Sequence, residues 1–270
     1  MISFKKIVDF YLRSSIHVAL SVYALVRMTH FMFNISGDEP MANFAFLGTI
    51  VGYNFVKYDA LARAKKKQMR KELKLIALLS LISLVGVGYY FFQLQFHTQI
   101  IAIVFLALTL LYTLPFFPNR KNARNWAGVK IYIVALCWVG VTLVLPLINA
   151  GLLLEADFYL KCVQRFILVF NLILVFEIID LSNDDPHLQT VPQQIGVKNT
   201  KMVGLLLLIP FYALEFLKHH FIQEQLIVNG VLVLVLAWFL AFANEKRSKY
   251  YTSFWVESIP IFWWLMVVFF

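Results

Sequence analysis

The sequence predicts an all-α membrane protein in which residues 1–270 form one polytopic helical bundle with nine transmembrane helices. The first observation is composition, because 61% of the residues are hydrophobic and only 14% are charged. A water-soluble domain needs more polar surface than this to cover its core, so much of the surface must face lipid. The second is a series of long apolar stretches, and the third is the placement of basic residues between them.

A transmembrane helix needs about 20 mostly apolar residues. Nine stretches of the sequence approach or reach that length, and short polar segments separate them. The expected spans are residues 15–33, 41–56, 75–92, 99–117, 131–154, 159–181, 203–222, 226–243 and 253–270. We interpret the first as a transmembrane helix and not as a cleaved signal peptide, because it is long enough to span and lacks a small-residue cleavage pattern.

The lysines and arginines predict the orientation of the chain. With the N-terminus in the cytoplasm, 20 of the 24 basic residues fall in the cytoplasmic segments. This bias predicts a cytoplasmic N-terminus and an external C-terminus, in a membrane such as the bacterial inner membrane. The net charge of +9 is therefore interpreted as topology and attraction to membrane lipids, with no nucleic-acid partner.

Carboxylates gather at the cytoplasmic end of the sixth expected span. On a helix that continues past residue 181, Asp180 and Asp184 share a face, and Glu177 lies one turn earlier on nearly the same stripe. Three like charges on one stripe repel one another, and a divalent cation removes that cost. Because all the ligands would be oxygens, the expected ion is Mg²⁺. The alternative is a helix that ends in a solvated acidic loop.

The second expected span ends in a mixed polar segment on the same side of the membrane. This segment carries Asn54, Lys57, Tyr58, Asp59 and Arg63. The basic residues that border this face of the membrane are Lys57, Arg63, Lys121, Arg124 and Lys198. Each alone is typical of a cytoplasmic loop, but carboxylates and cations at two helix ends together predict a site for a metal ion and a diphosphate.

Other polar residues lie within expected spans on the opposite half of the membrane. They include Arg27, Arg165 and Glu215. We interpret them as structural pairs between helices, in which the arginines pair with Glu215, and a transport pathway is the alternative.

These features resemble the UbiA superfamily of intramembrane prenyltransferases, whose nine helices carry aspartate-rich motifs at the cytoplasmic ends of the second and sixth. The second motif is similar here. Asp180 and Asp184 have the D-x-x-x-D spacing, and Thr190, Pro192 and Gly196 follow in a stretch that resembles T-L-P-x-x-x-G. The resemblance covers nearly the whole chain in span number and motif placement.

Two further stretches bear on the resemblance. Residues 111–115, LYTLP, precede basic residues and resemble a family pattern after the fourth span. The first motif, N-D-x-x-D-x-x-x-D, is matched at Asn54, and Asp59 lies one residue late. Its three aspartate positions are occupied by Phe55, Tyr58 and Ala62. Three interpretations stay open: Lys57 or Arg63 replaces a metal ion, a bend of the helix returns Asp59 to the site, or the chain is a non-catalytic relative.

The resemblance implies transfer of an isoprenoid chain from a polyprenyl diphosphate to a lipophilic acceptor, with Mg²⁺ as cofactor. It implies as catalytic residues Asp180, Asp184, Asn54 and Asp59, and as metal ligands the same four with Glu177. Aromatic rings stabilise cations and bind isoprenyl chains, and the expected lining residues are Tyr53, Tyr58, Tyr112 and Phe176. The alternatives are an inactive lipid-binding relative and a small transporter.

Overall fold

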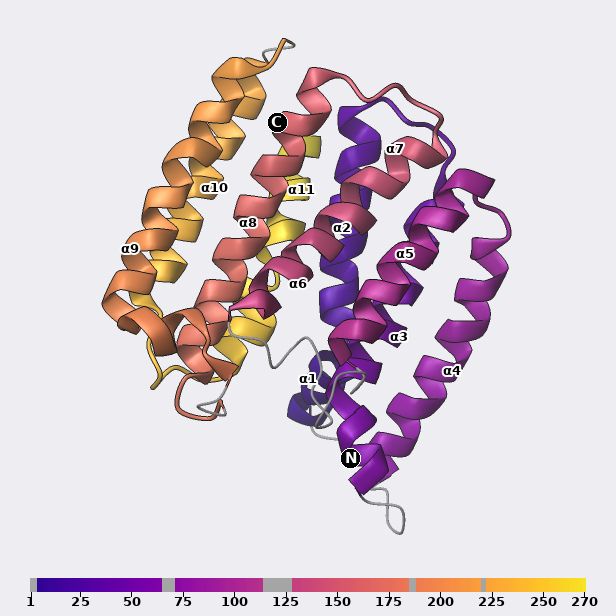
Figure 1. Ribbon diagram of the computed structural model, residues 1–270, viewed down its shortest axis with the longest axis vertical. Coiled ribbons are helices and arrows are strands. Elements are labelled where there is room, and N and C mark those ends of the chain that lie inside the picture. Colours follow the sequence, from indigo (N-terminus) through magenta and orange to yellow (C-terminus); the bar gives the residue numbers. More distant parts are fainter. Residues whose placement is uncertain (1–3, 65–70, 114–127, 185–187, 220–221) are drawn as a thin grey trace.

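The computed structural model describes residues 4–64, 71–113, 128–184, 188–219 and 222–270 (Figure 1). Helices make up all of the regular structure in these ranges, and no strand occurs in them, which confirms the all-α prediction.

The α-helices in chain order are α1 (Phe4–Arg13), α2 (Ile16–Met32), α3 (Glu39–Ala64), α4 (Lys71–Phe91), α5 (Phe96–Thr113), α6 (Val129–Val139), α7 (Leu145–Asn149), α8 (Ala156–Asp180), α9 (Val191–Ala213), α10 (Gln223–Phe242) and α11 (Ile259–Phe269). Two π-helical segments, η3 (Gly140–Val144) and η6 (Tyr251–Val256), and one 3₁₀ segment, η5 (Leu214–Leu217), complete the set.

Within the described residues, six helical segments are both long enough and apolar enough to cross a membrane. They are Lys71–Phe91, Val129–Asn149, Ala156–Asp180, Val191–Leu217, Gln223–Phe242 and Tyr251–Phe269. Two further apolar helices, Ile16–Met32 and Phe96–Leu111, are shorter. The expected span at 41–56 lies within α3, whose apolar stretch is interrupted by Asn43 and Asn54. Length and composition therefore identify a membrane protein with six clear candidate spans.

Helix α8 lies in the middle of the bundle, whereas α4 lies at one edge (Figure 1). In the most apolar part of each helix, 72% of the residues of α8 are buried, compared with 11% for α4. Helix α4 packs mainly against α3 and leaves Leu78, Leu81 and Val85 exposed. An apolar exposed face of this kind is expected where lipid, and not water, surrounds a helix.

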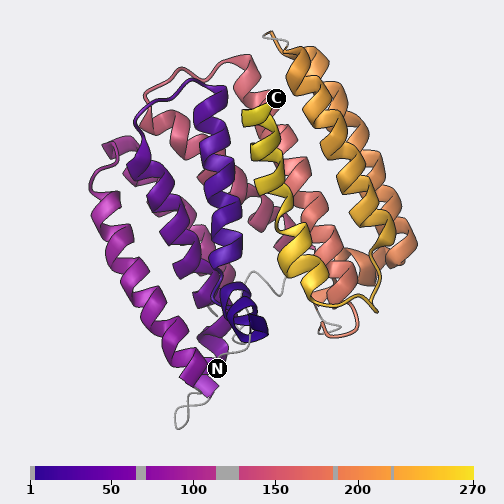
Figure 2. The same cartoon turned by 180° about the vertical axis from the view of Figure 1, so that it is seen from behind.

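Helices α2 and α11, near the two ends of the chain, pack side by side (Figure 2). Polar groups also join α2 to η6 and the turn after it, directly before α11. His17 Nε2 donates to the Phe254 carbonyl oxygen at 2.9 Å, and the Ser21 hydroxyl donates to the Glu257 carbonyl oxygen. Segment η6 also contacts α8, so it lies between the central helix and α2. This packing closes the bundle.

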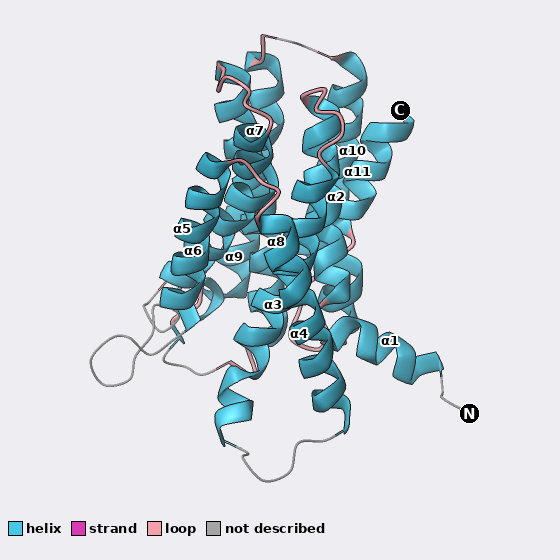
Figure 3. Cartoon of the chain, turned by 90° about the vertical axis from the view of Figure 1, so that its right-hand side faces the viewer, coloured by secondary structure: helices cyan, strands magenta, loops and turns pink. Residues whose placement is uncertain are grey.

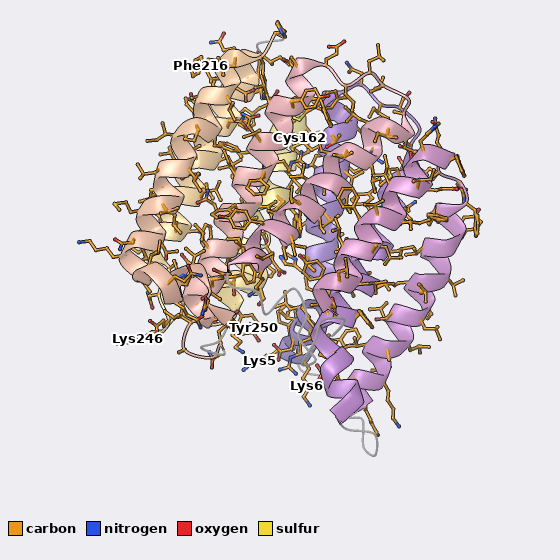
Figure 4. The ribbon with its side chains drawn as sticks, viewed as in Figure 1. Lys5, Lys6, Cys162, Phe216, Lys246 and Tyr250 are labelled. Atoms are coloured by element: carbon orange, nitrogen blue, oxygen red, sulfur yellow. The ribbon has the colours of Figure 1, made fainter. Side chains whose placement is uncertain are left out.

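The two ends of the bundle differ in their charged residues. Helix α1 projects at the end where α3 and α8 finish and α9 begins (Figure 3). The labelled side chains of Lys5, Lys6 and Lys246 lie at this end, which we call the basic end (Figure 4). The C-terminus lies near the opposite end, which we call the distal end (Figure 1).

Two residues with positive φ interrupt helices at the basic end. Ser15, with φ of 62°, separates α1 from α2. Gly196, with φ of 78°, bends α9 soon after its start. The left-handed region is open to glycine without a steric penalty, so the glycine of the T-x-P-x-x-x-G stretch has a backbone role.

Candidate acidic site at the basic end

The chain continues as a helical turn beyond the end of α8. The Asp184 backbone N–H donates to the Asp180 carbonyl oxygen at 2.9 Å, so the helical turn continues past the last residue of α8. The charge of Asp184 acts on both Glu177 and Asp180, which places the three carboxylates within electrostatic reach of one another. Asp180 and Asp184 therefore lie one turn apart on the same stretch of chain.

Glu177 joins α8 to the start of α9. Its side chain is buried, and Oε2 accepts the backbone N–H of Val191 at 3.0 Å. Gln193 Oε1 accepts the Thr190 N–H at 2.9 Å, as in a capping box. The first N–H groups of a helix lack partners within the helix, and a carboxylate near them also interacts favourably with the helix dipole. Glu177 thus fixes the T-x-P-x-x-x-G stretch beside the two aspartates.

Asp184 has a carboxylate oxygen without a partner. Its Oδ2 is buried and forms no hydrogen bond with any residue that the structure describes. Lys130, at the start of α6, acts electrostatically on both Glu177 and Asp180, and Lys249 acts on Asp180. A buried oxygen with spare bonding capacity between carboxylates and lysines can accept a bond from a metal ion or a donor on a substrate.

No group of three or more His, Cys, Asp or Glu side chains in the described part of the chain has the arrangement of a complete metal site. Glu177 is engaged with the start of α9, which leaves Asp180 and Asp184 as the available pair. Mg²⁺ is commonly held by one or two carboxylates, with water and substrate phosphates as the remaining ligands. The described residues therefore fit an ion that takes most of its ligands from outside the protein, and they do not form an all-protein cage.

The end of α3 faces different neighbours. Asn54 is buried, its Nδ2 donates to Ser80 Oγ of α4 at 3.0 Å, and its Oδ1 has no hydrogen-bond partner. Lys57 Nζ donates to Ser15 Oγ at 3.1 Å and lies 5.9 Å from the centre of the Tyr53 ring. Asn54 and Lys57 thus point toward different helices.

The remaining predicted residues are dispersed. The Tyr58 hydroxyl donates to the Arg13 carbonyl oxygen at 2.9 Å. The Tyr53 hydroxyl accepts Trp138 Nε1–H at 2.7 Å. Phe176 packs against the hydrophobic core, and Lys198 is exposed. Lys121 and Arg124 lie outside the described residues. Asp59 and Arg63 lie in α3 and Tyr112 lies in α5, but their side chains are outside the described part.

Sequence reasoning missed several polar residues of this end. Lys57 interacts electrostatically with Glu257, which lies directly after η6. Lys130 and Lys249 lie near the acidic group, although neither belongs to a motif. In the sequence, Lys130 and Lys249 are marked only by their position next to an apolar stretch, as are most of the other basic residues. The structure therefore forms two polar groups, one on α8 and one on α3, and η6 packs between α8 and α2.

Comparison with known proteins gives no assignment. No protein-family model, curated protein sequence or solved structure matches the chain.

Proposed function

We propose that the chain is a UbiA-like intramembrane prenyltransferase that transfers an isoprenoid chain from a polyprenyl diphosphate to a lipophilic acceptor. The observation that carries the proposal is the unpartnered Oδ2 of Asp184, which lies within electrostatic reach of Asp180 and Glu177. A buried carboxylate oxygen without a donor is costly unless a cation or a ligand completes it. The capped T-x-P-x-x-x-G stretch beside it also agrees with the family motif.

The proposal includes nine membrane crossings with a cytoplasmic N-terminus. Each of the nine expected spans overlaps a helix or consecutive helical segments of the described chain. The basic end carries lysines of α1 and of the α10–η6 connection, which is the arrangement that the positive-inside rule favours for a cytoplasmic face (Figure 4). Isoprenoid diphosphates in the cytoplasm would then reach the carboxylates of α8 directly.

Each polar residue has a distinct role in this proposal. Asp180 and Asp184 would hold Mg²⁺, which when bound stabilises the charge of the departing diphosphate. Lys57 and Lys130 would supply further positive charge, which would stabilise the negative charge of the diphosphate. Glu177 is a positioning residue, because its carboxylate is engaged with Val191 N–H. The apolar surroundings of α8 exclude water, which would otherwise capture the allylic cation.

One observation favours a second candidate, a relative that binds lipid diphosphates without turnover. Asn54 donates to Ser80, and Lys57 donates to Ser15, so the described side chains of the first motif are engaged within the protein. In this case the acidic site would bind its ligand, but no product would form.

The test uses purified protein in lipid nanodiscs with Mg²⁺, a labelled polyprenyl diphosphate and a membrane-lipid extract as acceptor. Binding and labelled product are measured for the wild type, Asp180→Asn and Asp184→Asn. We expect each variant to lose about 100-fold in product formation, as for removal of one stabilising electrostatic group. Glu245→Gln, an exposed carboxylate of the same end, is the matched control and should behave as wild type.

Three results separate the candidates. Mg²⁺-dependent binding with product supports the prenyltransferase, and binding without product with any acceptor supports the non-catalytic relative. Unchanged binding in the double aspartate variant excludes both.

The orientation has its own test. A reporter fused after Gln194 should report a cytoplasmic location, and one fused after Phe270 an external one. A Gln194 fusion that reports an external location would separate the site from cytoplasmic diphosphates and would contradict the proposal.

A further inference from the structure

A second polar group lies in the distal half of the bundle, around the first turns of α8. Cys162 and Phe216, neighbours in sequence of its members Lys161 and Glu215, are labelled in the upper half of Figure 4. We define the distal cluster as Lys161, Arg165, Lys218 and Glu215. Arg165 and Asp180 are fifteen residues apart on one helix, which corresponds to about 22 Å. The distal cluster is therefore separate from the acidic site.

The one carboxylate of the distal cluster already has its full set of partners. Lys218 Nζ donates to both oxygens of Glu215, at 2.5 and 2.6 Å. Gln164 Nε2 donates to Glu215 Oε2 at 2.7 Å, and Asn229 Nδ2 donates to the same oxygen at 2.9 Å. Glu215 therefore compensates one cation, Lys218, and has little capacity left for another.

Lys161 and Arg165 form no ion pair with any carboxylate in the described part of the chain. The closest acceptors of Lys161 Nζ are Gln225 Oε1 and Met32 Sδ, both at 3.5 Å. Arg165 is 2% exposed, and its Nη1 donates to Thr142 Oγ1 at 2.9 Å and to the Leu25 carbonyl oxygen at 3.4 Å. Its guanidinium also lies 5.4 Å from the centre of the Trp263 ring, but none of these partners carries a negative charge. Lys218 and Arg165 act on Lys161 as like charges, and Glu215 acts on it as an opposite charge. The cluster thus has three basic side chains and one carboxylate.

Two hydrogen-bond donors in or beside the distal cluster are buried without a partner. Arg165 Nε and Gln225 Nε2 form no hydrogen bond with any described residue. An unpaired cation or donor within a membrane protein is costly, and such groups usually pair with a charge or serve a function. A negatively charged group that accepts several hydrogen bonds would complete these donors.

We propose that the distal cluster binds a phosphate group, with Lys161, Arg165 and Gln225 as its ligands. A phosphate offers several acceptor oxygens, and a guanidinium is well suited to it because its N–H groups have a fixed fork geometry. Lys161 is partly accessible and lies near the distal end of α8, so a ligand can approach from that membrane face. The phosphate comes from a phospholipid headgroup of that leaflet or from free phosphate. This inference does not depend on the proposed prenyltransferase activity.

The experiment begins with the full chain, delipidated in a phosphate-free non-ionic detergent. Its unfolding temperature is measured with added phosphatidylglycerol, with diacylglycerol as the lipid that lacks a phosphate, and with inorganic phosphate at constant ionic strength. We expect phosphatidylglycerol or inorganic phosphate to raise the unfolding temperature, and diacylglycerol to leave it unchanged. Stabilisation by phosphatidylglycerol alone identifies a headgroup, and stabilisation by inorganic phosphate identifies the free ion.

Two variants locate the binding site. Lys161→Gln removes a charge-assisted contact and should weaken the apparent affinity about tenfold or more. Gln225→Leu removes the unpartnered donor without changing the net charge and should weaken it less. Lys246→Gln, an exposed lysine of the basic end, is the charge-matched control and should bind as wild type.

Two outcomes overturn the proposal. The first is a wild-type protein whose unfolding temperature responds to neither phosphatidylglycerol nor phosphate. The second is a Lys161→Gln variant whose unfolding temperature is higher than that of the wild type, with the same difference in the presence and in the absence of ligand. That result would mean that the cations repel one another and that no anion joins them.

Discussion

The two ends of α8 carry charge in opposite ways. At the basic end, Asp184 keeps a carboxylate oxygen without a donor, whereas at the distal end Glu215 accepts bonds from three side chains. Conversely, the distal cluster has unpartnered donors on Arg165 and Gln225. Among the described residues, one end therefore has an acceptor without a donor, and the other has donors without an acceptor.

This difference separates carboxylates that hold the fold together from carboxylates that are available to a ligand. Glu215 and Glu177 are both buried and hydrogen-bonded, so we expect their loss to reduce stability. Asp180 and Asp184 are partly exposed, and their neutralisation relieves mutual repulsion. Substitutions of these carboxylates and of their neighbours should therefore differ in their effects on stability and on ligand binding.

The largest effect is expected for Glu215→Ala. Removing the carboxylate that pairs with Lys218 among the described residues leaves a buried charge uncompensated, which costs about 3–5 kcal/mol in the free energy of unfolding. Unfolding in mixed micelles, followed by tryptophan fluorescence, measures this. Glu224→Ala, an exposed carboxylate of α10, should change stability by less than about 0.5 kcal/mol. Similar values for the two variants would contradict a structural role for Glu215.

The next effect concerns the end of α3. If Lys57 replaces a metal ion of the first motif, Lys57→Ala should weaken diphosphate binding by about tenfold to a hundredfold, as expected for a charge-assisted contact worth about 1.5–3 kcal/mol. Asp59→Asn should then have the smaller effect. A titration of binding against Mg²⁺ for both variants decides between them. A larger loss with Asp59→Asn, together with a weaker Mg²⁺ requirement, would identify Asp59 as the ligand instead.

A smaller effect is expected for Glu177→Ala. Loss of the acceptor for Val191 N–H resembles loss of a helix cap and should cost about 1–2 kcal/mol in stability. Glu177→Gln retains an acceptor oxygen and should recover most of that stability. If Glu177→Gln keeps the fold but removes Mg²⁺-dependent binding, Glu177 is a ligand and not a positioning residue.

The smallest effect is expected at Gly196. An alanine at φ of 78° is strained, so Gly196→Ala should lower stability by about 1 kcal/mol and should also disturb diphosphate binding. Gly88→Ala is the matched control, because Gly88 lies in α4 with open space around it. That substitution should be neutral or stabilising by up to about 1 kcal/mol. Equal effects on binding would show that the bend of α9 is unrelated to the site.

The helical architecture was predictable because each apolar stretch carries its own signal. Hydrophobicity over about 20 residues and basic flanks are local properties of the sequence. The stacking of Asp180 and Asp184 was equally local, since it depends only on continuation of one helix. Contacts of this kind follow from spacing alone.

Pairing between distant helices was harder to predict. The expected pairing of Arg27 and Arg165 with Glu215 was wrong. The Glu215 carboxylate instead pairs with Lys218, three residues later in the chain. Arg27 instead pairs with Glu39, and Arg165 with Thr142. Likewise, the proximity of Lys57 to Ser15 depends on the packing of α2 beside α3, for which the sequence carries no direct signal.

The packing of α2 against α11 also has a consequence for biosynthesis. His17 binds the carbonyl oxygen of Phe254, 237 residues later in the chain. At a translation rate of roughly 5–20 residues per second, tens of seconds pass between the synthesis of these two residues. During that time α2 lies in the membrane before the partners of His17 and Ser21 in and after η6 have been synthesised. A factor that shelters polar membrane helices during insertion should therefore crosslink to α2 until the ribosome has released the segment containing η6.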